Sequence, residues 1–151
     1  MSALDGLYQQ LILEHSKKRS GDGPLADAEA EHFERNPSCG DEITVRVKLD
    51  EAGTGLSELA WQGDGCSISM ASASVLSELA IGKTTAEIEE LVAAFRLMLR
   101  TRDGSEPDED LLEDAVAFQG VSKFVMRVKC AMLSWVALEA SLKEASVARE
   151  H

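Results

Sequence analysis

The sequence lacks the features that would tie it to a membrane or to secretion. No apolar run approaches the ~18 residues that a membrane-spanning helix requires, so we expect no membrane association. The N-terminus, Met1-Ser2-Ala3-Leu4-Asp5, does not show the basic-then-apolar order of a secretory signal peptide. These two absences predict a cytoplasmic protein.

Basic residues are scarce relative to acidic ones. The 151 residues include 15 Lys and Arg against 27 Asp and Glu, which gives a formal net charge of −12. A protein that binds nucleic acid needs a basic surface to replace condensed counterions, so we expect no nucleic-acid partner. The length suits one domain with a buried core, and we expect residues 1–151 to form a single domain.

Cysteine is also rare, with Cys39, Cys66 and Cys130 as its three positions. An odd number of cysteines in a reducing compartment does not suit a disulfide framework. The three residues are therefore either small buried apolar groups, or they bind metal or take part in sulfur chemistry.

The spacing of apolar residues predicts a helix, then strands, then further helices. The segment from Leu4 to Ile12 has helical spacing, residues 42–49 alternate strictly as in a half-buried strand, and residues 56–62 complete a hairpin. Further helices are predicted over 70–80, from Thr84 to Leu99, from Pro107 to about Gly120, and over 124–144. We therefore expect an α+β fold, with a small antiparallel sheet of about three strands, helices packed on one face and a long C-terminal helix.

Residues 20–38 are rich in Gly, Pro and acidic side chains and show no period, which predicts a loop. Two histidines, His15 and His32, lie in or beside this segment. We expect both to be solvated histidines of a helix or loop and not metal ligands.

One short segment, Asn36-Pro37-Ser38-Cys39-Gly40-Asp41, predicts a turn that leads into the first clear strand. Pro37 disfavours a helical Asn36, and Gly40 permits a backbone conformation that other residues resist. If the chain leaves the turn extended, Cys39 and Asp41 project to the same side, because alternate residues of a strand share a face. A thiolate and a carboxylate placed together would supply half of a metal site.

All three cysteines fall at the ends of predicted elements, where side chains from remote parts of a chain can converge. Cys66 follows Gly65 in a turn beyond the hairpin, and Cys130 lies in the opening turns of the last helix. No pair has the short spacing of an ordinary zinc site. Spacing alone therefore leaves open whether the cysteines form one metal site or are three unrelated buried residues.

Several segments resemble the signature blocks of the SufU/IscU (NifU N-terminal-like) family of iron–sulfur cluster biogenesis proteins. The blocks run from Asn36 to Asp41, from Gly63 to Ser74 and from Arg127 to Trp135, and the opening helix from Leu7 to His15 is also similar.

Within the family the chain is similar to the SufU branch. Lys129 stands where IscU proteins carry His, and the segment Phe124-Val125-Met126 lacks the proline that IscU proteins offer to their chaperone. Residues 101–120 resemble an extra segment that SufU proteins carry between the second and third blocks.

The resemblance implies that Cys39, Asp41, Cys66 and Cys130 bind one zinc ion. It implies that Cys39 accepts persulfide sulfur from a cysteine desulfurase of the SufS type, and that Arg127 assists near the site. It also implies that downstream iron–sulfur assembly proteins are partners. The expected function is a zinc-dependent sulfur carrier, which acts like a sulfurtransferase with its desulfurase; whether the chain is itself an enzyme is left open.

Two other functions remain possible on the same residues. In an IscU-like scaffold, the three cysteines and Asp41 would hold an iron–sulfur cluster in place of zinc, although Lys129 in the position of the IscU histidine disfavours this. In an interaction domain, the same four residues would form a purely structural zinc site.

Overall fold

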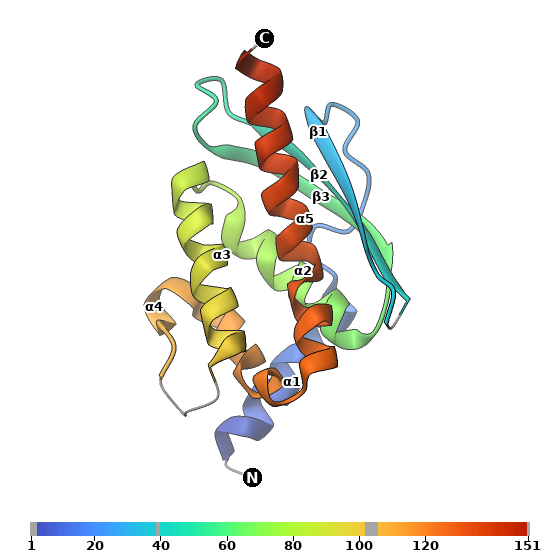
Figure 1. Cartoon of the computed structure of the whole chain (residues 1–151), viewed down its shortest axis with the longest axis vertical. Helices are drawn as coiled ribbons and strands as arrows, with labels where there is room; N and C mark the ends of the chain where they lie inside the picture. The colour runs from blue at the N-terminus through green and yellow to red at the C-terminus, as the bar shows by residue number, and fades with distance from the viewer. Residues whose placement is uncertain (1–2, 39, 102–105, 151) are drawn as a thin grey trace.

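A computed structural model of the chain describes residues 3–38, 40–101 and 106–150 (Figure 1). Its antiparallel sheet has the order β1-β2-β3, formed by β1 (Ala30–Asn36), β2 (Asp41–Leu49) and β3 (Leu56–Asp64). The helices are α1 (Ala3–Lys18), α2 (Ser67–Ala80), α3 (Thr85–Arg100), α4 (Glu109–Leu112) and α5 (Val125–Glu150), and a 3-10 helix, η1 (Glu113–Lys123), precedes α5. The predicted α+β fold, with its small antiparallel sheet and long C-terminal helix, is confirmed.

The central strand β2 follows its sequence pattern closely. Its alternate residues Ile43, Val45, Val47 and Leu49 are buried, and the side chains between them are exposed or partly exposed. On the buried face, α5 lies along β1 and β2 while α2 packs beside α5 and against β3. The strand therefore carries the sheet side of the core, and its first residue, Asp41, lies at the edge of that core.

The loop predicted over 20–38 is wrong in its second half, because Ala30–Asn36 form β1. This strand alternates between partly buried and exposed side chains, but its residues are mostly polar. It pairs with β2 along its whole length, from Ala30 opposite Val47 to Asn36 opposite Asp41. Pairing with β2 and packing against α5 stabilise a strand that its own composition does not predict.

The two histidines are less solvated than the sequence predicts. His15 is 5% exposed, and its Nδ1 lies 2.8 Å from the Ser74 hydroxyl of α2. His32 lies in β1 and is partly buried, with its ring nitrogens 2.8 Å from a Glu34 carboxylate oxygen and 3.1 Å from one of Glu144. Burial opposes the charge on His32, but these two carboxylates outweigh it and raise the pKa of His32.

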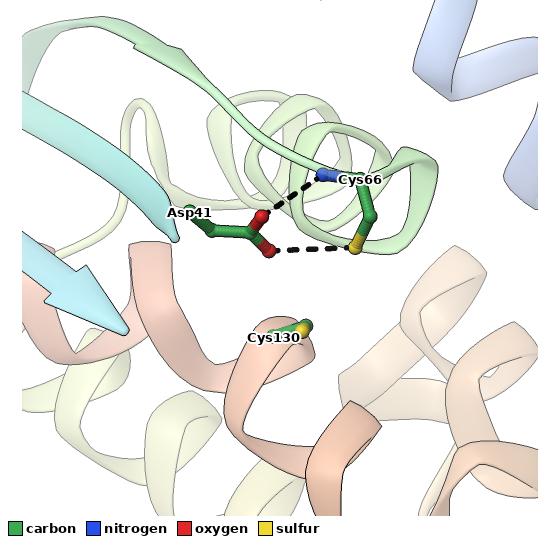
Figure 2. A group of neighbouring side chains, drawn as sticks. All are labelled: Asp41, Cys66 and Cys130. Carbon is green, nitrogen blue, oxygen red and sulfur yellow. Dashed lines mark hydrogen bonds between the residues drawn. The ribbon is translucent and has the colours of Figure 1, made fainter. Parts of the chain in front are cut away.

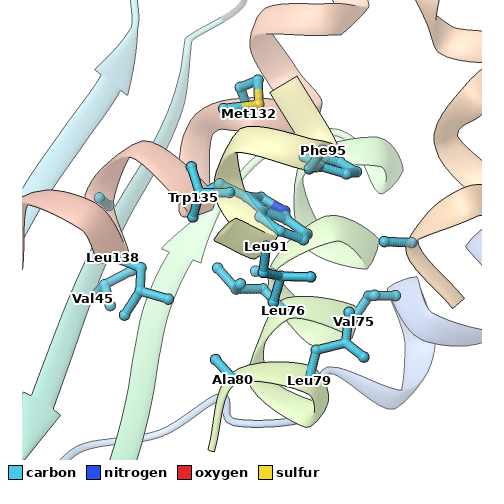
Figure 3. Packing of buried hydrophobic residues seen from close by; sticks show 14 of the residues in the cluster. Val45, Val75, Leu76, Leu79, Ala80, Leu91, Phe95, Met132, Trp135 and Leu138 are labelled. Carbon is cyan, nitrogen blue, oxygen red and sulfur yellow. The ribbon is translucent and has the colours of Figure 1, made fainter. Parts of the chain in front are cut away.

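The hydrophobic core is built around α2 and α5, which pack against each other, with α3 on α5. The Trp135 ring of α5 stacks on Phe95 of α3, with ring centroids 3.9 Å apart (Figure 3). The Trp135 indole donates to the Ser72 hydroxyl at 2.8 Å, and Ser72 donates to the Ala131 carbonyl at 2.6 Å. These contacts fix the N-terminal half of α2 against the N-terminal half of α5.

The remaining helices agree with prediction in part. The capping box predicted at Thr84 and Glu87 is present at the start of α3. The helix predicted from Pro107 is a single turn, α4, followed by η1, and the last helix continues beyond residue 144 to Glu150. Of the predicted extra segment 101–120, residues 102–105 lie outside the described part of the chain. None of the described helices is long and apolar enough to cross a membrane.

Candidate metal centre

Three predicted ligands meet at the end of the sheet where β2 begins (Figure 2). Asp41 is the first residue of β2, Cys66 directly precedes α2, and Cys130 lies in the second turn of α5. One ligand atom from each residue lies within 4.8 Å of the other two. The fold therefore joins three side chains that are remote in the sequence, and we call this group the Asp41–Cys66–Cys130 centre.

The Asp41 carboxylate is oriented by the first turn of α2. Its Oδ1 accepts a hydrogen bond from the Cys66 backbone N–H at 3.1 Å. Its Oδ2 accepts from the Ser69 hydroxyl and lies 3.4 Å from the Cys66 sulfur. A carboxylate at the start of a helix is also favoured by the partial positive charge of the unpaired backbone N–H groups there.

Gly65 leaves the space that the Asp41 side chain occupies. A Cβ atom at position 65 would lie 2.7 Å from Cγ of Asp41, closer than real Cβ contacts come. The glycine before Cys66 is thus required by a close approach between two elements, which explains why a turn residue stands there.

Cys130 is held by Asn36, the last residue of β1. The Asn36 side-chain amide donates to the Cys130 sulfur at 3.8 Å, and its oxygen accepts from the Ser38 backbone N–H at 3.1 Å. The Asn36 carbonyl also accepts from the Gly40 N–H at 2.8 Å, with Gly40 at a φ of +74°. Asn36 therefore links the β1–β2 turn to α5, and Gly40 adopts the left-handed conformation that its sequence context predicts.

The centre is buried on one side and open on the other. Asp41 is 3% exposed and Cys130 is 4% exposed, whereas Cys66 is exposed. Cys66 and the described residues of the β1–β2 turn, Pro37, Ser38 and Gly40, are exposed, so a partner molecule can approach the centre from this side.

The three side chains fit a tetrahedral zinc ion. Zinc binds thiolate sulfur at about 2.3 Å and carboxylate oxygen at about 2.0–2.2 Å, so tetrahedral ligand atoms lie about 3.6–3.8 Å apart. The Cys66 sulfur and Asp41 Oδ2 are 3.4 Å apart, and all three donors fall within 4.8 Å of one another. Cysteine thiolates also ligate iron–sulfur clusters, so the donor set is compatible with that alternative.

Two of the predicted site residues stay predictions. Cys39 lies outside the described residues. Arg127 is exposed on the first turn of α5, and its guanidinium carbon lies 5.4 Å from the centroid of the Phe124 ring.

Sequence reasoning assigned no role to Asn36 or Ser69, although both contact the centre. Asn36 was visible only as a turn residue, and its contact with Cys130 depends on the pairing of β1, which the sequence did not predict. Ser69 lies three residues after Cys66, a spacing that places the two side chains on the same face of a helix. That spacing is the sequence feature that could have indicated a role for Ser69 beside Cys66.

Comparison with known proteins supports the family resemblance. The model of the NifU-like N-terminal domain family matches residues 7–131. The chain is 42% identical to the zinc-dependent sulfurtransferase SufU of Bacillus subtilis, over 90% of this chain and 89% of that protein. It is 36% identical to the iron–sulfur cluster assembly scaffold protein IscU of Streptococcus pyogenes, over 99% of this chain and 91% of that protein.

The chain is also similar to a solved structure. A Fervidobacterium islandicum protein that carries the name of an iron–sulfur cluster assembly scaffold for the SUF system superposes with a TM-score of 0.80 at 35% identity, over 88% of this chain and 94% of that one. The chain belongs to the NifU-like N-terminal domain family, which includes the SufU and IscU proteins of iron–sulfur cluster assembly.

Proposed function

We propose that the chain is a zinc-dependent sulfur carrier that accepts persulfide sulfur from a SufS-type cysteine desulfurase in the cytoplasm. The observation that carries the proposal is the convergence of Asp41, Cys66 and Cys130 at a site that is open on one side. The similarity to a protein named a zinc-dependent sulfurtransferase supports it. In this proposal Cys39, two residues before Asp41 in the sequence, is the fourth ligand and the sulfur acceptor, and iron–sulfur assembly proteins downstream receive the sulfur.

The chemistry asked of the chain is a thiol–persulfide exchange. Zinc, when bound, keeps its cysteine ligands deprotonated at neutral pH. The Cys39 thiolate attacks the outer sulfur of the donor's persulfide, the donor's S–S bond breaks, and the donor cysteine leaves as a thiolate. A new S–S bond forms on Cys39, and the transferred sulfur keeps its oxidation state, so no external oxidant is needed.

The described cysteines differ in their suitability as acceptors. Cys130 is buried in α5, out of reach of a persulfide on another protein. Cys66 is exposed, and it is the competitor that an experiment has to separate from Cys39. Arg127 on the exposed first turn of α5 is proposed to assist by placing a positive charge near the anionic sulfurs.

An anaerobic desulfurase assay tests the acceptor assignment. The zinc-loaded chain should raise desulfurase turnover, and peptide mass analysis should find one extra sulfur on Cys39. Cys39→Ser should reduce the turnover to that of the desulfurase alone, while Ser38→Ala, the neighbouring control, should keep the stimulation. Full stimulation by Cys39→Ser, or a persulfide on Cys66, would contradict the assignment.

The scaffold function remains the second candidate, because a relative and a solved structure carry that name. The same anaerobic preparation separates the two. A sulfur carrier should contain about one zinc per chain with no visible absorption, as expected for a d¹⁰ ion. Iron, sulfide and a brown chromophore in the preparation would favour the scaffold.

We also propose that the desulfurase covers the apolar surface beside the centre. Phe124, Val125 and Met126 are exposed at the start of α5. Phe124 also lines a groove that runs between α1 and η1 to Ser67 and Ile68, the residues that follow Cys66. An enzyme that brings a persulfide to the open side of the centre would lie over this groove.

A charge placed on this apolar surface should weaken docking without disturbing the metal. Phe124→Asp should raise the concentration of the chain that gives half-maximal desulfurase stimulation by about tenfold or more, as expected for a buried aromatic anchor of an interface. The zinc content should not change. Leu97→Asp, an exposed apolar position on α3, is the matched control. Equal behaviour of the two variants would argue against docking at this surface.

A further inference from the structure

We propose that Ser69 is a positioning residue of the metal centre, and that its hydroxyl holds the Asp41 carboxylate in the orientation that binds metal. The inference rests on the metal centre of the proposed function, but it does not depend on sulfur transfer or on Cys39.

The first observation is how the Asp41 carboxylate is shared between two donors of α2. Cys66 is the N-cap residue of this helix and Ser69 is its third helical residue. At the start of α3 the same two positions, Thr84 and Glu87, bond to each other's backbone N–H in a local capping box. At the start of α2 a carboxylate from a different element is inserted: Asp41 accepts the Cys66 N–H on one oxygen and the Ser69 hydroxyl on the other.

The second observation is the direction in which the Asp41 carboxylate is held. The Cys66 N–H fixes Oδ1 and the Ser69 hydroxyl fixes Oδ2, so the two hydrogen bonds together set the orientation of the carboxylate. The Cys66 sulfur, 3.4 Å from Oδ2, shows that this oxygen faces the metal donors.

The third observation is burial. Ser69 is 2% exposed and Asp41 is 3% exposed, so water does not compete for their hydrogen bond. The Ser69 oxygen also lies 3.6 Å from the Cys66 sulfur, so the hydroxyl contacts two of the metal donors. Hydrogen bonds to charged groups are stronger than neutral ones, and partners of metal ligands typically change metal affinity by about 10–100-fold when removed.

Two effects of the Ser69 hydroxyl on metal binding have opposite signs. Donation to the carboxylate withdraws electron density and weakens Asp41 as a ligand, whereas fixing its orientation reduces the ordering cost of binding. We expect orientation to dominate, because the loss of such a partner usually lowers affinity. Removing the hydroxyl should therefore weaken metal binding.

The test measures zinc affinity by competition with a chromophoric chelator, using the full chain. Ser69→Ala should weaken zinc binding about 10–100-fold, and the absorption spectrum of the cobalt-substituted protein should change. Ser77→Ala is the matched control, because Ser77 is a buried serine of α2 that donates to the Ala73 carbonyl of its own helix. Its affinity should stay within about twofold of the unmodified chain.

A double-mutant cycle distinguishes positioning from a general effect on the fold. If Ser69 acts through Asp41, Ser69→Ala should change zinc affinity by less than about twofold when Asp41 is already Asn. Ser69→Thr, which keeps the hydroxyl, should restore most of the affinity. The proposal is overturned if Ser69→Ala binds zinc normally, or if it weakens binding equally in both backgrounds. Should Ser69→Ala not fold, a folded Ser69→Thr that loses tenfold in affinity would overturn it as well. None of these readouts involves a desulfurase, so failure here leaves the sulfur-carrier function standing.

Discussion

Replacing Asp41 with alanine should both abolish tight zinc binding and destabilise the metal-free protein. Structural zinc contributes about 10–16 kcal/mol in four-ligand peptides, or about 2.5–4 kcal/mol per ligand, so losing one ligand should weaken binding by about 10²–10³-fold. The same substitution leaves the Ser69 hydroxyl buried without its acceptor and removes the carboxylate from the start of α2. These two losses should cost about 2–4 kcal/mol in the free energy of unfolding of the metal-free protein.

Thermal melting of the metal-free variant checks the second half of this prediction. For a chain of this length, 1 kcal/mol corresponds to about 2–4 °C, so Asp41→Ala should melt about 5–15 °C lower. Asp41→Asn should lose zinc affinity to a similar degree and lose less in melting temperature, because its amide oxygen can still accept from Cys66. Glu42→Ala, which removes an exposed carboxylate at the next position, should change neither quantity. Unchanged melting of metal-free Asp41→Ala would show that Asp41 does not stabilise α2.

Removal of the metal should lower the melting temperature of the unmodified chain without unfolding it at room temperature. A ligand that binds only the folded state stabilises it by about 4 kcal/mol at a thousand times its dissociation constant, which corresponds here to about 8–16 °C. The chain should stay folded because the centre lies at the edge of the core, and the core is built around the stacked rings of Phe95 and Trp135 (Figure 3).

The loosening caused by chelation should be local, and hydrogen exchange can locate it. Amide protection should fall in the β1–β2 turn, at the start of α2 and in the first turns of α5, the three segments that the centre joins. A chain with both Cys66→Ser and Cys130→Ser should be insensitive to chelator, which makes it the control. An unmodified chain that melts at the same temperature with and without chelator would contradict this prediction.

Much of the fold could be predicted because several segments carry a local sequence signal for a strand or a helix. The strict alternation from Ile43 to Leu49 defined β2, and the capping box at Thr84 defined the start of α3. The strand β1 was missed because its polar side chains carry no apolar period, and its structure depends on β2 and α5. A strand that is stabilised mainly by its neighbours cannot be predicted from its own residues.

The candidate centre, like the fold, could be predicted from the sequence only in part. The family resemblance implied that Asp41, Cys66 and Cys130 share one site, and the structure brings them together. Spacing alone could not decide this, because the three residues meet only through the packing of β2, α2 and α5. The roles of Asn36 and Ser69 depend on contacts with residues 94 and 28 positions away, which no local pattern encodes.

The order in which the donors occur along the chain has a consequence for biosynthesis. Cys130 is supplied by the last helix, so a polypeptide still being translated offers at most an incomplete set of donors until that helix has emerged and docked. Asp41, Cys66 and Cys130 can therefore act together only after α5 has been synthesised and has packed against α2. Truncated products that end before α5 would lack Cys130 and would hold zinc more weakly than chains that contain it.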